Sequence, residues 1–262
     1  MPRQPRRLPP WATLHVISRG NRRQNIFEEN TDWQRFLDSM LGETAAEGVI
    51  ILAYCLMPNH FHLLLQAAIN SLSRSMHSIL TSHAAYMNKK YGRTGHLFQD
   101  RFKTILCDPE IGVKPLVRYI HRNPVKAGLI SRPEQWPWSS HRDFMNPASE
   151  MPPGKIEVLK LFGANREDAI RSYAEYMEPD PEFIRAQGRG KFPLDKLAAM
   201  VERELGHFPG FLRQRSHQHD LTGARAYFVH LAMDAGFSAK EVAEFLCLAE
   251  DSVYRLKRGW KH

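Results

Sequence analysis

The chain is poor in cysteine and has no long apolar run. Its three cysteines stand at the scattered positions Cys55, Cys107 and Cys247. An odd number of isolated cysteines predicts neither a disulfide framework nor a zinc knuckle, and it favours a reducing cytoplasm. No apolar run is long enough to span a bilayer, and the chain starts with polar and basic residues. We therefore expect no membrane segment and no signal peptide.

Acidic residues are too few to balance the basic ones in the first part of the chain. Residues 1–145 contain 19 Lys and Arg but only 11 Asp and Glu, which gives them a net charge of +8. Residues 146–262 contain 17 of each and are neutral overall. A basic domain attracts polyanions, of which nucleic acid is the commonest. The alternative is that the excess charge serves only solubility.

A stretch rich in proline divides the chain. Residues 146–155 contain three prolines and a glycine and show no hydrophobic periodicity, which is typical of a linker. The 262 residues also fit two domains better than one. We therefore predict a first domain over residues 1–145, a linker over 146–155 and a second domain over 156–262.

The first domain alternates between strand and helix patterns. In order, the pattern predicts a strand at 13–18, a helix from 31 or 32 to Gly48, strands at 49–57 and 60–66, a helix at 72–91, a strand at 97–106 and a helix from Asp108 that stops before Pro124. This order indicates an α+β fold, a ferredoxin-like antiparallel sheet with helices packed on one face.

The second domain reads as mostly α-helical. Its apolar periodicity predicts helices at 166–177, 194–205, 222–235, 238–246 and 250–258. The last three follow one another closely and resemble a helix-turn-helix over residues 222–258, in which the final helix would enter the DNA groove. The alternative is a small helical bundle without DNA contact, which the neutral charge of this half favours.

Two histidines lie one residue apart in the predicted strand 60–66. Side chains of a strand alternate between its faces, so His60 and His62 share a face, with Cβ atoms about 7 Å apart. Phe61, Leu63 and Leu65 then point into the core. Two neutral imidazoles at this spacing can bind one metal ion. Two ordinary histidines would give the same pattern.

A tyrosine and an asparagine lie one helical turn apart in the predicted helix that ends before Pro124. Tyr119 and Asn123 share a helix face because they are four residues apart. Together they could supply a nucleophile and a third metal ligand. A half-buried helix tyrosine and an asparagine that ends the helix remain the alternatives.

Several ordered blocks of this sequence resemble one known family. They run from His15 to Asn21, Met57 to Leu64, Gly95 to Phe102, Tyr119 to Leu129 and Trp136 to His141. Over roughly residues 12–145 the sequence resembles the single-tyrosine HUH transposases, and most closely their REP-associated branch. That branch is linked to repeated extragenic palindromes in bacterial genomes.

The resemblance implies roles for four residues. His60 and His62 match the histidine pair, Tyr119 matches the nucleophile, and Asn123 matches the polar residue that helps to hold Mg²⁺ or Mn²⁺. Members of the family cut single-stranded DNA beside a hairpin, form a 5′-phosphotyrosine, and rejoin the strand to another 3′-OH. Pro115 is a departure, since a proline four residues before Tyr119 requires the helix either to restart there or to kink.

Basic and aromatic residues supply candidate DNA contacts. In the first domain they are Arg19, Arg22, Arg23, Arg101, Lys103, Arg118 and Arg122. In the predicted final helix they are Tyr254, Arg255, Lys257 and Arg258. Each of these residues could equally be a solvated charge or a packed aromatic side chain.

The leading hypothesis is a metal-dependent transposase that binds single-stranded or hairpin DNA as a monomer or homodimer, in the bacterial cytoplasm and on the nucleoid. One alternative is a domesticated regulator that binds palindromic repeats without transposition activity. Another is a metal-dependent nuclease that uses water in place of Tyr119.

Overall fold

The computed structural model falls into two compact units, each with its own hydrophobic core. The first unit comprises residues 1–107 and 116–177, and the second comprises residues 108–115 and 178–262. The structure describes residues 11–107, 112–150, 152–178, 193–204, 210–214, 219–234 and 237–259. Within these ranges, none of the helices combines the length and the apolar character needed to cross a bilayer.

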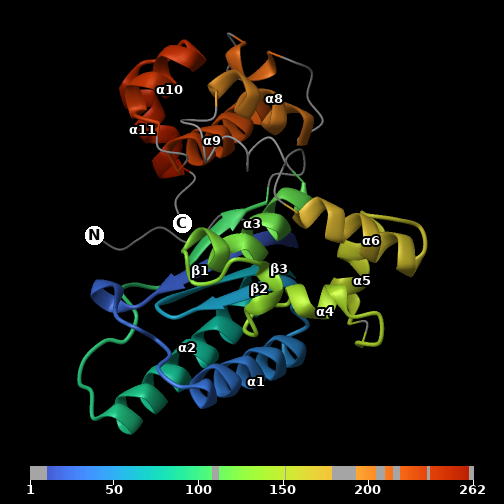
Figure 1. The fold of residues 1–262 in the computed structure, drawn as a ribbon. Coiled ribbons are helices and arrows are strands. Elements are labelled where there is room, and N and C mark those ends of the chain that lie inside the picture. Colours follow the sequence, from blue (N-terminus) through green and yellow to red (C-terminus); the bar gives the residue numbers. More distant parts are fainter. Residues whose placement is uncertain are drawn as a thin grey trace. The chain divides into compact units, whose positions relative to one another are not determined.

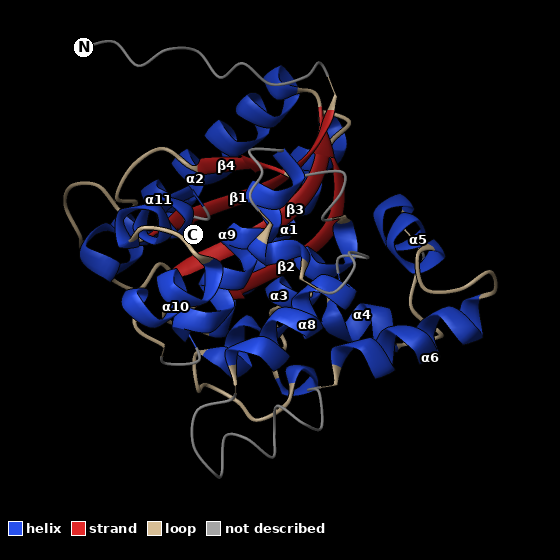
Figure 2. Ribbon diagram, turned by 90° about the horizontal axis from the view of Figure 1, so that it is seen from above, coloured by secondary structure: helices blue, strands red, loops and turns tan. Residues whose placement is uncertain are grey.

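Four strands of the first unit form one antiparallel sheet (Figures 1 and 2). They are β1 (Ala12–Arg19), β2 (Ile50–Met57), β3 (His60–Ala67) and β4 (Lys103–Leu106), in the spatial order β2-β3-β1-β4. Helix α1 (Asn30–Ala46) connects β1 to β2, and α2 (Ile69–Tyr91) connects β3 to β4. This β-α-β-β-α-β order is ferredoxin-like, so the predicted α+β class is confirmed.

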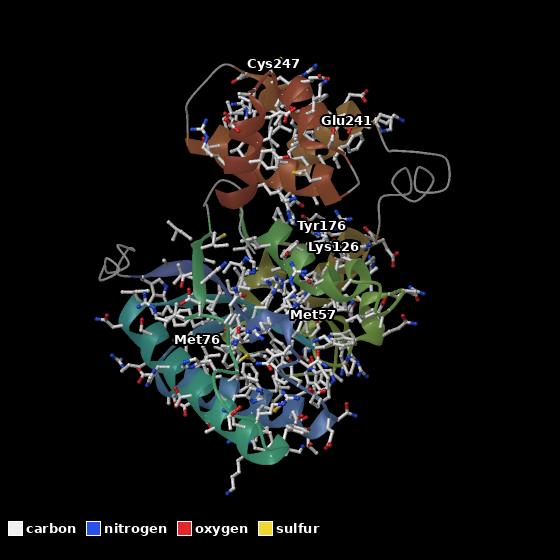
Figure 3. All side chains as sticks on the ribbon, turned by 90° about the vertical axis from the view of Figure 1, so that its left-hand side faces the viewer. Met57, Met76, Lys126, Tyr176, Glu241 and Cys247 are labelled. Atoms are coloured by element: carbon white, nitrogen blue, oxygen red, sulfur yellow. The ribbon has the colours of Figure 1, made fainter. Side chains whose placement is uncertain are left out.

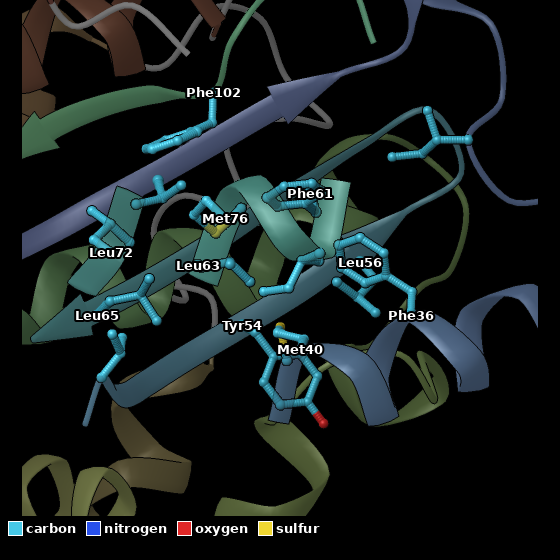
Figure 4. Close-up of a cluster of buried hydrophobic side chains, with 14 of the residues drawn as sticks. Phe36, Met40, Tyr54, Leu56, Phe61, Leu63, Leu65, Leu72, Met76 and Phe102 are labelled. Atoms are coloured by element: carbon cyan, nitrogen blue, oxygen red, sulfur yellow. The ribbon is translucent and has the colours of Figure 1, made fainter. Parts of the chain in front are cut away.

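The hydrophobic core lies between the sheet and helices α1 and α2, which cover the same face (Figure 1). Phe61, Leu63 and Leu65 of β3 are fully buried in it, as strand alternation predicts. Figure 4 shows these side chains in one cluster with Phe36 of α1 and Met76 of α2. The core fixes the β3 register, because a slip by one residue would move all three side chains to the other face.

Helix α3 (Val113–Lys126) covers the opposite face of the sheet, which corrects the expectation that all helices pack on one face. The ring of Tyr119 on α3 contacts His15 of β1 and His62 of β3, which point away from the core. The apolar run in β2 explains the difference: Ala53, Cys55 and the neighbouring residues of β2 are buried on both faces. A sheet buried on both faces needs a covering layer on each of them, and α3 forms part of the second layer here.

The two prolines of α3 are accommodated differently. Pro115 lies in the first turn, where its missing N–H has no acceptor within the helix, so α3 starts beside it. Pro124 was expected to follow the helix, but it lies inside α3. The helix continues to Lys126, and beyond its end Ala127 and Leu129 donate backbone hydrogen bonds to the carbonyls of Asn123 and Pro124. The expected helix start at Asp108 lies outside the described residues.

The strand predicted over residues 97–106 is shorter than expected. Only Lys103–Leu106 pairs with β1 as a strand, and Phe98 forms an isolated bridge with Gly20. Between them, Arg101 donates its backbone N–H to the Asp100 carboxylate at 2.8 Å. This local hydrogen bond competes with strand pairing, as aspartate side chains often do. The 3-10 turn η1 (Asn21–Arg23) follows β1.

The first unit ends with short helices that follow the 3-10 turn η2 (Pro133–Gln135). They are α4 (His141–Met145), α5 (Pro153–Lys160) and α6 (Arg166–Met177). Helix α5 begins within the predicted linker and packs on β2, where Gly154 meets the backbone of Ile51. Both α5 and α6 belong to the first unit, which therefore extends beyond the predicted domain end at residue 145.

The second unit is helical, as predicted. It contains α8 (Leu194–Glu204), the turn η3 (Phe211–Arg213), α9 (His219–Asp234), α10 (Ala239–Leu246) and α11 (Glu250–Gly259). Apolar residues of these helices form its core, among them Val201, Phe228 and Val253. The buried Glu202 carboxylate accepts the backbone N–H groups of Gly210 and Leu212 at 2.9 and 3.0 Å, which fixes η3 against α8.

A buried histidine on α2 predicts that the first unit is sensitive to acid. His83 is 1% exposed, and its Nε2–H donates to the Ile26 carbonyl at 2.7 Å. Burial lowers the pKa of His83 to about 4, against the hydrogen bond, which raises it. The folded state therefore keeps His83 neutral, whereas the unfolded chain binds a proton near pH 6.5. Stability should fall as the pH drops from about 6.5 to 4, by up to about 3 kcal/mol from this residue.

Urea unfolding at a series of pH values tests this prediction. The native protein should lose stability between pH 6.5 and 4, and His83→Gln should show a shallower loss because glutamine does not titrate. His77→Gln is the matched control, since His77 is an exposed histidine on the same helix. Equal slopes for the native protein and His83→Gln would contradict the assignment.

Candidate metal and nucleophile site

Strand β3 presents both histidines of the predicted pair to the face opposite the core. The rings of His60 and His62 are nearly perpendicular, with centroids 5.0 Å apart. His62 is 1% exposed, and His60 is half-buried. The strand therefore brings two imidazoles close enough to share one ion.

A neighbouring amide fixes the orientation and tautomer of His60. The Asn59 side-chain N–H donates to the Arg23 carbonyl at 3.2 Å, so its Oδ1 faces His60. That oxygen lies 2.7 Å from His60 Nδ1. An amide oxygen can only accept, so Nδ1 carries the proton, and a neutral His60 has its lone pair on Nε2. This is the tautomer that binds a metal through Nε2.

A third histidine, which the sequence analysis did not select, holds His62. His15 of β1 lies on the same face, and its Nε2 is 3.0 Å from His62 Nδ1. The two rings stack with centroids 5.2 Å apart, and His15 is only 5% exposed. If His62 donates from Nδ1, its lone pair is on Nε2, as in His60. The sequence signals for His15 were its place at the start of the His15 to Asn21 block and its alternation with Ile17 in a strand.

Helix α3 carries the predicted nucleophile to this pair. The ring of the half-buried Tyr119 lies edge-on to His62, with centroids 5.5 Å apart, and to His15, with centroids 6.0 Å apart. Tyr119 and His62 are far apart in sequence, so the contact depends on the packing of α3 against the sheet. The structure thus brings the two predicted halves of the site together.

Two more residues of α3 follow Tyr119 along the helix. Asn123 is 8% exposed and lies one turn after Tyr119, as predicted. Lys126 lies two turns after it, with Nζ 5.5 Å from the centre of the Tyr119 ring (Figure 3 labels Lys126). Within the described ranges, no three His, Cys, Asp or Glu side chains group to hold a metal. A third protein ligand beside the two imidazoles would therefore be of another residue type, and Asn123 is the predicted one.

Cations also lie on the site face of the sheet. Arg19 of β1 lies opposite His60 of β3. Ile17 of β1 lies opposite His62 on one side and opposite Lys103 of β4 on the other. Residues directly opposite each other in an antiparallel pair project to the same face. Arg19 and Lys103 therefore project to the face that carries the histidines. Arg22 and Arg23 of η1, which follows β1, and Arg101, which precedes β4, are also exposed.

The other two arginines predicted to bind DNA contact helix α6. Arg118 stacks its guanidinium over the Tyr176 ring at 5.3 Å, and Arg122 donates to the Met177 carbonyl at 2.5 Å. Their role in DNA binding remains a prediction. The structure gives both residues a contact within the protein that the sequence did not suggest.

The residues predicted to bind DNA in the second unit lie on α11. Tyr254, Arg255 and Lys257 are exposed there, and the side chain of Arg258 lies outside the described residues. The preceding helix α10 begins with a capping box between Ser238 and Glu241, and a left-handed residue, Cys247, ends it. The short turn to α11 fits the predicted helix-turn-helix.

The first part of the chain is similar to known transposases. Residues 11–123 match the family model described as "Transposase IS200 like". A predicted REP-associated tyrosine transposase of Haemophilus influenzae is 33% identical over 35% of this chain, and the match spans 58% of that relative. A solved REP-associated tyrosine transposase bound to a REP hairpin has a TM-score of 0.46 and 22% identity, over 55% of this chain and 85% of that one. The resemblance seen in the sequence is thus confirmed: residues 11–123 of this chain are similar to the IS200-like transposases, and the chain spans less than two thirds of the curated relative's length.

Proposed function

We propose that this protein is a transposase that cuts and rejoins single-stranded DNA at hairpins formed by palindromic repeats, with Tyr119 as the nucleophile. One observation carries the proposal: α3 holds the Tyr119 ring 5.5 Å from that of His62, on a face that also holds His60. The hairpin substrate follows from the resemblance to the REP-associated branch. The charge of +8 on residues 1–145 supports a polyanionic substrate.

The residues of the site fit one divalent cation. His60, His62 and Asn123 would hold Mg²⁺ or Mn²⁺, with His60 protonated on Nδ1 beside Asn59 and its Nε2 lone pair available to the ion. Two imidazoles are an unusual set for Mg²⁺, which prefers oxygen ligands, so we expect weak binding completed by water and phosphate oxygens. When bound, the ion would polarise the scissile phosphate and orient it toward the tyrosine oxygen.

Tyr119 would make and break the phosphodiester directly. Its Oη attacks the phosphorus, the bond from phosphorus to the 3′ oxygen breaks, and that oxygen gains a proton to leave as a free 3′-OH. The phenol loses its proton, and the ammonium of Lys126 beside the ring favours the resulting negative charge. The reverse step, with another 3′-OH, needs no external energy because the phosphotyrosine retains the phosphodiester bond.

DNA would reach the site along the cations on the same sheet face. Arg19 and Lys103 project to that face and can bind phosphates beside the histidine pair. The exposed Arg22, Arg23 and Arg101 would extend this track. In the second unit, the exposed Tyr254, Arg255 and Lys257 of α11 are proposed as a separate contact to duplex DNA.

A covalent trapping assay tests the proposed reaction. Native protein, Mn²⁺ and a single-stranded hairpin substrate labelled at either end would be combined and separated on a denaturing gel. We expect the fragment on the 3′ side of the cut to stay attached to the protein, and peptide mapping to find it on Tyr119. Hairpin binding without cleavage would instead support the regulator. Cleavage without an adduct would support a nuclease that uses water.

His15 gives a prediction about metal affinity. His15→Phe removes the hydrogen-bond partner of His62 Nδ1 while it keeps an aromatic ring in the same place. Loss of such a partner typically weakens metal binding by about 10- to 100-fold. Mn²⁺ titration followed by electron paramagnetic resonance would measure this, and His15→Gln, whose amide oxygen can accept from His62, should restore part of the affinity. Native affinity in His15→Phe would contradict the role.

A further inference from the structure

Three residues of α3, the helix that carries Tyr119, contact α6. Arg118 stacks on Tyr176 at 5.3 Å, His121 lies 2.7 Å from the Tyr173 hydroxyl, and Arg122 donates to the carbonyl of Met177, the last residue of α6. These residues occupy consecutive turns around Tyr119. Figure 3 labels Tyr176 on α6 and Lys126 at the C-terminal end of α3.

The central contact of the three is a buried hydrogen-bond network. The Tyr173 hydroxyl lies between His121 Nδ1 at 2.7 Å and His141 Nδ1 at 2.6 Å. His121 Nε2 lies 2.7 Å from Ser140 Oγ, which accepts the Tyr54 backbone N–H at 2.9 Å. Tyr173 is fully buried, and His121 and His141 are at most 1% exposed. The network thus joins α3 and α6 to β2 and to the start of α4.

One arrangement of protons satisfies this network best. His141 Nε2 is buried without a hydrogen-bond partner, which costs less for a lone pair than for an N–H. His141 therefore carries its proton on Nδ1 and donates to Tyr173, and Tyr173 donates to His121 Nδ1. His121 then donates from Nε2 to Ser140. The Tyr173 hydroxyl accepts from His141 and donates to His121, so removal of this oxygen breaks one hydrogen bond of each imidazole.

The network adds to the buried apolar side chains of α3, Leu116, Val117 and Ile120, in fixing the position of the helix. Pro124 interrupts the backbone hydrogen bonds of α3 between Tyr119 and Lys126. Residues 141–177 lie beyond the family match, which ends at residue 123. The helix that carries the predicted nucleophile is therefore held from outside the matched region.

We propose that Tyr173 is a positioning residue, whose hydroxyl sets the rotation of α3 about its axis and so the place of Tyr119 beside His62. This inference rests on the proposed function for its catalytic consequence. A rotation of α3 would move Tyr119, Asn123 and Lys126 together, because they share one helix face. Misplacement by about 1 Å can lower a rate by about 100-fold.

Tyr173→Phe tests the proposal because it removes one oxygen and keeps the ring. Hydrogen exchange followed by mass spectrometry would report on residues 116–126, and single-turnover trapping would separate the rate of adduct formation from hairpin affinity. We expect exchange in α3 to rise more than in α1 and α2. We also expect the adduct rate to fall about 10- to 100-fold, with hairpin affinity within about two-fold.

Met76→Ala is the matched control, because it destabilises the core on the far side of the sheet without touching the network. It should not raise α3 exchange above that of the other helices. The proposal would be overturned if Tyr173→Phe and Met76→Ala gave the same pattern of hydrogen exchange. It would also be overturned if Tyr173→Phe raised exchange in α3 but formed the adduct at the native rate. If native protein forms no adduct, the proposed function fails, while the exchange comparison still decides whether Tyr173 holds α3.

Discussion

Tyr119→Phe should abolish the covalent protein–DNA adduct and lower strand cleavage by at least about three orders of magnitude. The substitution removes only the attacking oxygen, and the phenylalanine ring can keep the edge-on packing against His62 and His15. Hairpin affinity should stay within about two-fold of native, since Arg19 and Lys103 are unchanged. The measurement is single-turnover trapping with Mn²⁺, together with a binding titration on the same hairpin.

The matched control for this prediction is Tyr86→Phe. It makes the same chemical change on α2, where the Tyr86 hydroxyl donates to Asp32 on the other side of the sheet. That variant should form the adduct at the native rate. Cleavage that survives in Tyr119→Phe would show that water is the nucleophile, and the histidine pair would then belong to a hydrolytic nuclease.

Gly154→Ala should destabilise the first unit by about 3 kcal/mol, which corresponds to a melting temperature lower by about 10 °C. A Cβ at this position would overlap the carbonyl oxygen of Ile51 and approach Ile50 Cγ2 to 3.2 Å. Both neighbours belong to β2, whose backbone is held by pairing with β3. The strand cannot move aside without breaking those hydrogen bonds, so α5 must shift instead.

Gly42→Ala is the matched control, with the opposite expected sign. Gly42 lies inside α1, and an added Cβ would meet nothing within 4 Å. Alanine is the better helix former, so this variant should gain about 0.5–1 kcal/mol. Thermal melting of both variants gives the comparison. Two similar melting temperatures would show that α5 does not pack on β2 as described.

The sequence predicted the parts of the site that depend on local geometry. Alternation along β3 placed His60 and His62 on one face and Phe61 in the core, and helical spacing placed Asn123 one turn after Tyr119. These relations need only the rise and period of a strand or helix. The family resemblance then linked the two halves, which no local pattern could do.

Long-range packing supplied what the sequence analysis missed. His15 reaches His62 only through the β1–β3 pairing, and the contacts of Arg118 and Arg122 with α6 join segments more than 50 residues apart. The proline-rich stretch before α5 was interpreted as a linker because prolines and a glycine usually end structure. Here Gly154 instead allows the close approach of α5 to β2, a use that local composition cannot reveal.

The pairing of β1 with β3 also makes the contact between His15 and His62 depend on the correct strand register. His15 contacts His62 only in the register that places Ile17 opposite His62. A slip of β1 by one residue would turn His15 into the core and bring a leucine or valine of β1 to the site. A misregistered sheet would therefore lack the partner of His62 as well as the fit of its core. Metal affinity could then serve as a probe for the register of the two central strands, which spectroscopic measures of overall strand content cannot detect.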